Sequence, residues 1–91
     1  MTQDHAEVIA LGALGWLAEA DLLDTFMSAT GAERDAIRAA AESPEFLGAV
    51  LDFALMDDTW VRGICDAQNL SYDSLLRARA ALPGGDLPHW T

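Results

Sequence analysis

The sequence predicts an all-α fold, a compact bundle of five to six short helices around one central buried helix. Three observations support this prediction. Apolar residues recur at helical spacing in successive segments, capping and breaking residues separate those segments, and the segment 43–56 is apolar on most of its faces. With 91 residues, 52% of them hydrophobic, the chain is long enough to form a single helical domain, 1–91, with its own core.

The first expected helix covers residues 3–18, with Thr2 as its cap and Asp4 in its first turn. Its apolar residues spread around most of the circumference, which predicts burial on more than one side. Gly12 and Gly15 lie in the helix interior, where a glycine costs about 1 kcal/mol relative to alanine. We interpret these glycines as points where a neighbouring helix approaches closely.

Two shorter helices are expected next. The first covers residues 21–30 and should end where Gly31 takes a left-handed conformation. The second covers residues 34–42 and carries an Arg38 to Glu42 pair on its outer side.

The central helix follows a strong start signal. Ser43 can cap it through its hydroxyl, Pro44 suits the first helical position, and Glu45 lies near the positive end of the helix dipole. Beyond this start only Gly48 and Asp52 interrupt the apolar run, and their spacing places them on one narrow face. The residues expected to be among the most buried are Phe46, Val50, Leu51 and Phe53.

Two further helices complete the expected bundle. One starts at Asp57 or Asp58 and ends at Asn69, a residue that tolerates the left-handed conformation of a helix end. The other is capped by Ser71 and is ended by the Pro-Gly-Gly run 83–85. This last helix is expected to present Leu75, Leu76 and Leu82 and to carry an Asp73 to Arg77 pair.

Residues 20–41 and 58–79 resemble each other when the chain is shifted by about 38 residues. The shift aligns Phe26 with Ile64 and Gly31 with Asn69. The alignment predicts two similar helical hairpins joined by the central helix, and chance similarity in an alanine-rich chain is the alternative.

The composition argues against nucleic-acid and membrane partners. Fifteen acidic residues against five arginines and no lysine give a net charge of -10, which repels phosphate backbones and anionic lipid surfaces. Residues 1–30 hold no arginine at all, so an electrically uneven surface is expected. That surface either only keeps the protein in solution or receives a basic partner.

Cys65 is the single cysteine, which excludes an intramolecular disulfide and is typical of a reducing, cytoplasmic location. The N-terminal residues lack the basic flank of a signal peptide. The apolar stretch 6–18 is too short to cross a bilayer, which needs about 20 residues.

No residue is assigned a catalytic, cofactor-binding or metal-binding role, and no cofactor is expected. His5 and Glu7 are two positions apart, so a helix points them in different directions. Cys65 lies mid-helix beside an acid, where a buried and inert thiol is expected. Asp57 and Asp58 are explained by helix capping.

Residues 25–41 have the form of a helix-turn-helix whose second helix carries Arg34 and Arg38. Acids flank both arginines, so this helix is net negative and would meet DNA phosphates unfavourably. Nucleic-acid binding is therefore the least favoured of the functions considered.

The C-terminal residues 82–91 depart from helical composition. Proline and glycine prevent a helix there, while Leu87 and Trp90 are more apolar than a solvating tail requires. We expect an ordered tail. It is either a strap that closes its own core or a segment that binds a partner through Leu87, His89 and Trp90.

Three segments carry a resemblance to a known family: DHAEVIAL at 4–11, FLGAVLDF at 46–53 and ALPGGD at 81–86. They are similar to small uncharacterised bacterial proteins that are catalogued as a domain of unknown function. The resemblance covers nearly the whole chain. It implies a short, cytoplasmic, all-helical bacterial protein and supplies no catalytic or binding residue.

The leading functional hypothesis is a small helical protein–protein interaction module without catalytic activity, which acts on a protein partner or as a homodimer. The alternative is a small enzyme or enzyme subunit that brings His89, Cys65 or scattered acids into one pocket.

Overall fold

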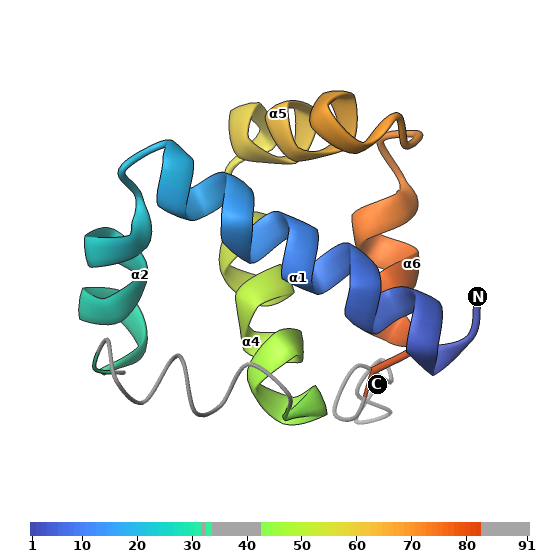
Figure 1. Cartoon of the computed structure of the whole chain (residues 1–91), viewed down its shortest axis with the longest axis horizontal. Coiled ribbons are helices and arrows are strands. Elements are labelled where there is room, and N and C mark those ends of the chain that lie inside the picture. The colour runs from blue at the N-terminus through green and yellow to red at the C-terminus, as the bar shows by residue number, and fades with distance from the viewer. Residues whose placement is uncertain (32, 34–42, 83–91) are drawn as a thin grey trace, which may run out of the picture.

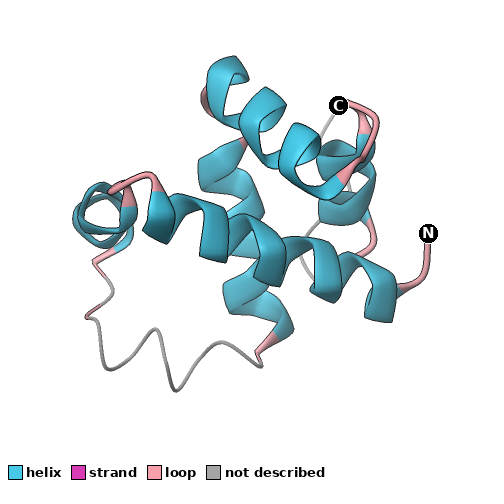
Figure 2. Ribbon diagram, turned by 45° about the horizontal axis from the view of Figure 1, so that its top comes forward, coloured by secondary structure: helices cyan, strands magenta, loops and turns pink. Residues whose placement is uncertain are grey.

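The computed structural model describes residues 1–31, 33 and 43–82, and it shows five helices within them (Figure 1). In chain order they are α1 (Gln3–Glu19), α2 (Leu23–Thr30), α4 (Pro44–Ala54), α5 (Asp58–Gln68) and α6 (Ser74–Ala80). The described residues contain helices and connecting loops and no strand, so the all-α prediction is confirmed for them (Figure 2). The expected helix 34–42 and the expected ordered tail 83–91 lie outside the described residues.

Three of the predicted helix starts are confirmed by their side-chain hydrogen bonds. Thr2 Oγ1 accepts from the His5 N–H at 3.2 Å, and Ser43 Oγ accepts from the Phe46 N–H at 3.4 Å. Asp57 Oδ1 accepts from the Thr59 N–H at 2.8 Å. Each bond satisfies a backbone donor that the first turn of a helix leaves unpaired, which is why these starts can be recognised from local sequence.

The predicted left-handed helix ends are also confirmed. Gly31 follows α2 with a φ of 76°, and Asn69 follows α5 with a φ of 57°. Glycine has no side chain to clash in this conformation, and asparagine tolerates it better than most residues. The aligned Phe26 and Ile64 are both fully buried. The first helices of the two aligned stretches therefore agree, while residues 34–41 lie outside the described residues.

Two predicted helix starts are wrong. α2 begins at Leu23 instead of Asp21, because Asp21 takes a left-handed conformation with a φ of 59° that cannot continue into a helix. α6 begins at Ser74, and Ser71 does not cap it. The Ser71 hydroxyl instead donates to Asp73 Oδ1 at 2.6 Å, and α6 begins without a side-chain cap.

The helix α1 packs against every other described helix (Figure 1). The helix α4 packs mainly against α1, α2 and α6, and one aromatic pair joins it to α5. The helix α4 is deeply buried, as predicted, but it shares the central place in the bundle with α1. The largest fully buried side chains are Phe26, Ile9, Leu17, Leu47, Leu51, Ile64, Leu75 and Val50.

Three burial predictions need correction. Phe46 is only partly buried, because it lies at the edge of the core with its ring perpendicular to that of Phe26. Leu76 is 61% exposed, since it lies on the side of α6 away from the neighbouring helices. The helix α1 is buried on one side only: Val8 and Leu11 are exposed.

An aromatic row joins three helices on one side of the core. The Phe26 ring of α2 lies edge-on to the Phe53 ring of α4, with centroids 5.3 Å apart. Phe53 in turn stacks on Trp60 of α5 at 4.9 Å. Such aromatic pairs contribute about 0.5–1.5 kcal/mol each beyond the burial of their area.

Three glycines lie where a long side chain from another helix crosses the backbone. A Cβ atom added at Gly12 of α1 would meet the amide of Gln68 of α5, and one added at Gly63 of α5 would overlap the ring of Trp16 of α1. The helices α1 and α5 thus each provide a glycine for a side chain of the other. This confirms the close approach predicted at Gly12.

The third such contact involves Gly48 of α4. A Cβ atom there would lie 2.7 Å from Arg79 Nη1, and the same guanidinium donates from Nε to Asp52 Oδ1 at 2.6 Å. Arg79 of α6 therefore covers the narrow face that Gly48 and Asp52 share. Gly15, in contrast, has open space around it, so the close approach predicted there is wrong.

We expect alanine to have opposite effects at two helical glycines. Gly63→Ala should destabilise the protein by about 1 to 3 kcal/mol, because the added methyl displaces the rigid Trp16 ring. Gly15→Ala should stabilise it by about 0.5 to 1 kcal/mol, because alanine favours the helix and meets no neighbour. Urea denaturation of both variants measures the two effects. Equal signs would contradict the contact between Gly63 and Trp16.

Candidate functional site

The outer side of α1 carries a row of exposed apolar and small residues, which we call the α1 seam. Its members are Val8, Leu11, Gly15 and Ala18. Val8 is 64% exposed and Leu11 is 45% exposed, and both are among the large apolar side chains that the described chain leaves in solvent. In Figure 1, α1 lies in the foreground with no described helix in front of it.

The seam arises because the buried residues and the exposed apolar and small residues of α1 fall on opposite sides of the helix. The buried side consists of Ala6, Ile9, Ala10, Ala13 and Leu17. The exposed members follow each other at intervals of three, four and three residues, which keeps them in one line along a helix. Asp4 precedes Val8 by four residues and Glu19 follows Gly15 by four, so both acids share the exposed side.

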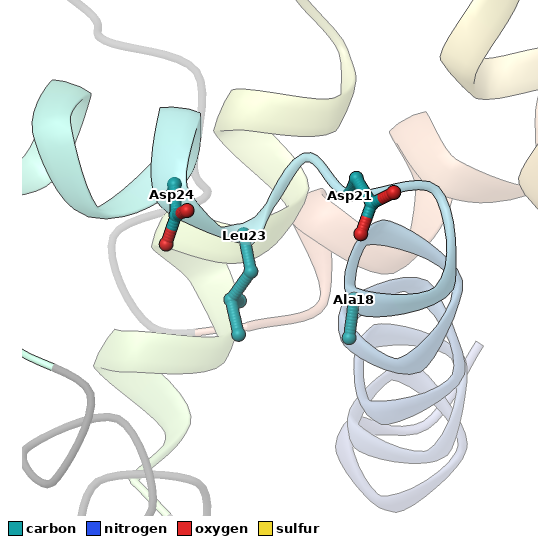
Figure 3. Close-up of a pocket in the computed structure, with 4 residues that line it drawn as sticks. All are labelled: Ala18, Asp21, Leu23 and Asp24. Atoms are coloured by element: carbon teal, nitrogen blue, oxygen red, sulfur yellow. The ribbon is translucent and has the colours of Figure 1, made fainter.

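A shallow hollow of about 280 Å³ lies at the end of the seam, where α1 turns into α2 (Figure 3). Ala18, Asp21, Leu23 and Asp24 line it, so Ala18 belongs to both the seam and the hollow. Figure 3 shows Leu23 between Asp24 at the start of α2 and Asp21 after the end of α1. The hollow is therefore lined by two apolar side chains and two carboxylates.

The acids at this end of α1 lie in a region without arginine or lysine. Residues 1–31 contain neither residue type. Each described arginine pairs with an aspartate outside this region: Arg62 with Asp58 at 3.1 Å, Arg77 with Asp73 at 3.4 Å and Arg79 with Asp52 at 2.6 Å. Glu19 is the last residue of α1, where the negative end of the helix dipole favours cations over carboxylates.

The structure buries Cys65 completely. Burial raises the pKa of its thiol, and the backbone hydrogen bond at Leu75 only partly opposes that rise. A thiol with a raised pKa holds little of the nucleophilic thiolate near neutral pH. The prediction of a buried cysteine is confirmed.

The remaining candidates from the sequence have structural roles where the structure describes them. Glu7 accepts a hydrogen bond from Gln3 Nε2 at 3.0 Å, and His5 lies exposed nearby. Asp57 caps α5, and Asp58 pairs with Arg62. Among the described residues no group of three histidine, cysteine or acidic side chains is placed to hold a metal ion.

Two pKa shifts mark the turn between α5 and α6. The Ser71 hydroxyl, and next the Arg77 guanidinium, lower the pKa of Asp73. The Tyr72 hydroxyl donates to Asp66 Oδ1 at 2.9 Å, and this bond raises the pKa of Tyr72. All of these groups are exposed and face their own turn, so the shifts report how the turn is held together.

Leu87, His89 and Trp90 lie outside the described residues, as does the second helix of the helix-turn-helix considered above. Their suggested roles stay predictions. The sequence interpretation missed the α1 seam, because it expected the first helix to be buried on more than one side, whereas Val8 and Leu11 are exposed. The signal was present, since Asp4 and Glu19 fall on the same side of the helix as these two residues.

Comparison with known families gives a match over most of the chain. The family model described as a protein of unknown function (DUF3572) covers residues 3–85. The chain belongs to this family. The expected membership in a domain of unknown function is thereby confirmed, and the DUF3572 description adds no activity. No curated protein and no solved structure matches the chain.

No helix among the described residues has both the length and the apolar character that crossing a bilayer demands.

Two aspartate–arginine pairs should differ in their contribution to stability. The Arg79 side chain is only 16% exposed. Asp52→Asn would remove the negative charge that pairs with this largely buried guanidinium, so we expect the free energy of unfolding to fall by about 1 to 2 kcal/mol. Asp58→Asn is the matched control. Both members of its pair are mostly exposed, and we expect about 0 to 0.5 kcal/mol. Thermal or urea denaturation compares them, and equal losses would contradict this ranking.

The Cys65 thiol should resist labelling in the folded protein. At pH 8 we expect a thiol reagent such as DTNB to react at least about 100-fold more slowly with the native chain than with the chain in urea, because burial restricts access and raises the thiol pKa. Absorbance measurements of the labelling reaction, without urea and at a series of urea concentrations, give the labelling rates of the native and the unfolded chain. Native labelling within about ten-fold of the unfolded rate would show an accessible thiol.

Proposed function

We propose that the protein is a small helical protein–protein interaction module without catalytic activity, and that the α1 seam is its binding surface. The observation that carries the proposal is the exposure of Val8 and Leu11 in one line with Gly15 and Ala18 on the outer side of α1. Contiguous apolar surface bordered by polar residues is typical of sites that bind another protein. A cytoplasmic location, in keeping with the single free cysteine, is part of the proposal.

The energetic argument concerns what these side chains lose by being exposed. Full burial of a valine or leucine side chain contributes about 1.5–3 kcal/mol relative to exposure. Gly15 and Ala18 add little bulk, so a partner can approach the backbone of α1 closely at that end. The exposed apolar side chains and the small residues beside them therefore favour a complex in which a second apolar surface covers the seam.

A small enzyme or enzyme subunit is the alternative, and it depends on Cys65, His89 or scattered acids. The burial and raised pKa of Cys65 count against a nucleophilic role. Asp57 caps a helix, and Asp58 and Asp73 pair with nearby arginines. The interaction module is therefore the better supported of the two.

Affinity capture with matched variants tests the proposed function. The wild-type chain, Leu11→Asp and Leu76→Asp are immobilised and exposed to native lysate, and captured proteins are quantified by mass spectrometry. Leu76 is the control because it is an exposed leucine on another helix. We expect at least one protein whose recovery falls about ten-fold or more with Leu11→Asp and less than about two-fold with Leu76→Asp.

Two outcomes would contradict the proposal. One is that no captured protein depends on Leu11. The other is equal loss with both variants, which would indicate non-specific adhesion to exposed apolar residues. Circular dichroism spectra that match the wild type confirm that each variant is folded.

A further inference from the structure

We infer that the α1 seam, together with the acidic hollow at its end, binds a basic amphipathic helix of a partner protein. The inference rests on the proposed function and goes beyond it by naming the chemistry of the partner. It depends on three properties of the surface: the line of apolar residues, the open space above Gly15, and the acids at both ends of that line.

The spacing of the seam matches a helical partner. Intervals of three, four and three residues are those of the a and d positions of a coiled coil, in which side chains of one helix fit between those of the other. From Val8 to Ala18 the seam spans about 15 Å at 1.5 Å per residue, or about three turns. A partner helix of similar length would rest its larger apolar residues against Gly15 and Ala18.

The charge at the ends of the seam selects a basic partner. Asp4 lies at one end on the exposed side of α1, and Glu19 and Asp21 lie at the other. The negative end of the α1 dipole adds to the acids at the second end. Lysine or arginine side chains flanking the apolar stripe of a partner helix would meet these carboxylates. Complementary charge of this kind raises the rate and specificity of association.

Charge also argues against two other occupants. A second copy of the chain would bring its own seam acids, so like charges would face one another in a homodimer through this surface. Residues 83–91 carry no lysine or arginine, and their charged residue is Asp86. Neither occupant would neutralise Glu19 and Asp21.

The size of the surface sets the expected affinity. A contact of three helical turns is smaller than the roughly 800 Å² per partner of a standard interface, so a dissociation constant of about 10–100 µM is expected for an isolated helix. Part of this affinity should be electrostatic and should fall as salt shortens the screening length.

Fluorescence anisotropy with two synthetic peptides tests the inference. Both are labelled helical peptides of about 18 residues with leucine at a and d positions and alanine and glutamine elsewhere, and they differ only at the e and g positions, which are lysine in one and glutamate in the other. At 50 mM salt we expect the lysine peptide to bind the wild-type protein at least about ten-fold more tightly than the glutamate peptide, and the difference to shrink at 300 mM salt.

Matched variants separate the seam from general attraction to an acidic protein. Leu11→Gln, and Glu19→Gln with Asp21→Asn, should each weaken the lysine peptide by about five-fold or more. The controls are Leu76→Gln, and Glu45→Gln with Asp66→Asn, which remove an exposed leucine and two exposed acids elsewhere. These controls should change the affinity by less than about two-fold.

Four results would overturn the inference. The first two are equal affinity for the two peptides and equal effects of the seam and control variants. The third is wild-type self-association, seen in sedimentation velocity, that Leu11→Gln abolishes. The fourth is tighter peptide binding by Trp90→Ala, which would indicate that the tail covers the seam.

The failures of the two proposals are distinguishable. A natural partner that depends on Leu11, combined with no preference for the lysine peptide, leaves the interaction function standing and rejects the basic helix. Selective peptide binding without any Leu11-dependent partner does the reverse.

Discussion

The structure depends on how closely other helices can approach α1. Every other described helix packs against this one, and seventeen residues must provide surface for all four. Small residues make that crowding feasible: the buried side of α1 alternates alanines with Ile9 and Leu17, and Gly12 admits the amide of Gln68. A methyl group added at Gly12 would fit only if the Gln68 amide moved.

Packing on one side of α1 leaves its other side available. If the seam residues were buried by this chain, the fold would need another element over Val8 and Leu11, and the described residues provide none. The acids follow the same division. Described arginines pair with aspartates on or beside α4, α5 and α6, while residues 1–31 contain acids and no arginine in their sequence. An apolar surface with an acidic border is therefore a direct result of how the bundle is assembled.

Local features were predictable from the sequence, and tertiary ones were less so. The caps at Thr2, Ser43 and Asp57 depend on residues within three positions, so local patterns identify them. The edge position of Phe46 depends on which helices lie beside it, information that periodicity does not contain. For the same reason the sequence indicated close packing at both Gly12 and Gly15, whereas only Gly12 has a neighbour.

A double-mutant cycle between Trp16 and Gly63 tests most directly whether α1 and α5 are held by reciprocal contact over glycine. Gly63→Ala is measured by urea denaturation in the wild-type background and in Trp16→Ala. With the indole removed, the account predicts that the alanine becomes stabilising by about 0.5 to 1 kcal/mol, because only its helix preference remains. The same destabilisation in both backgrounds would show that Trp16 does not set the requirement for glycine, and would contradict the account.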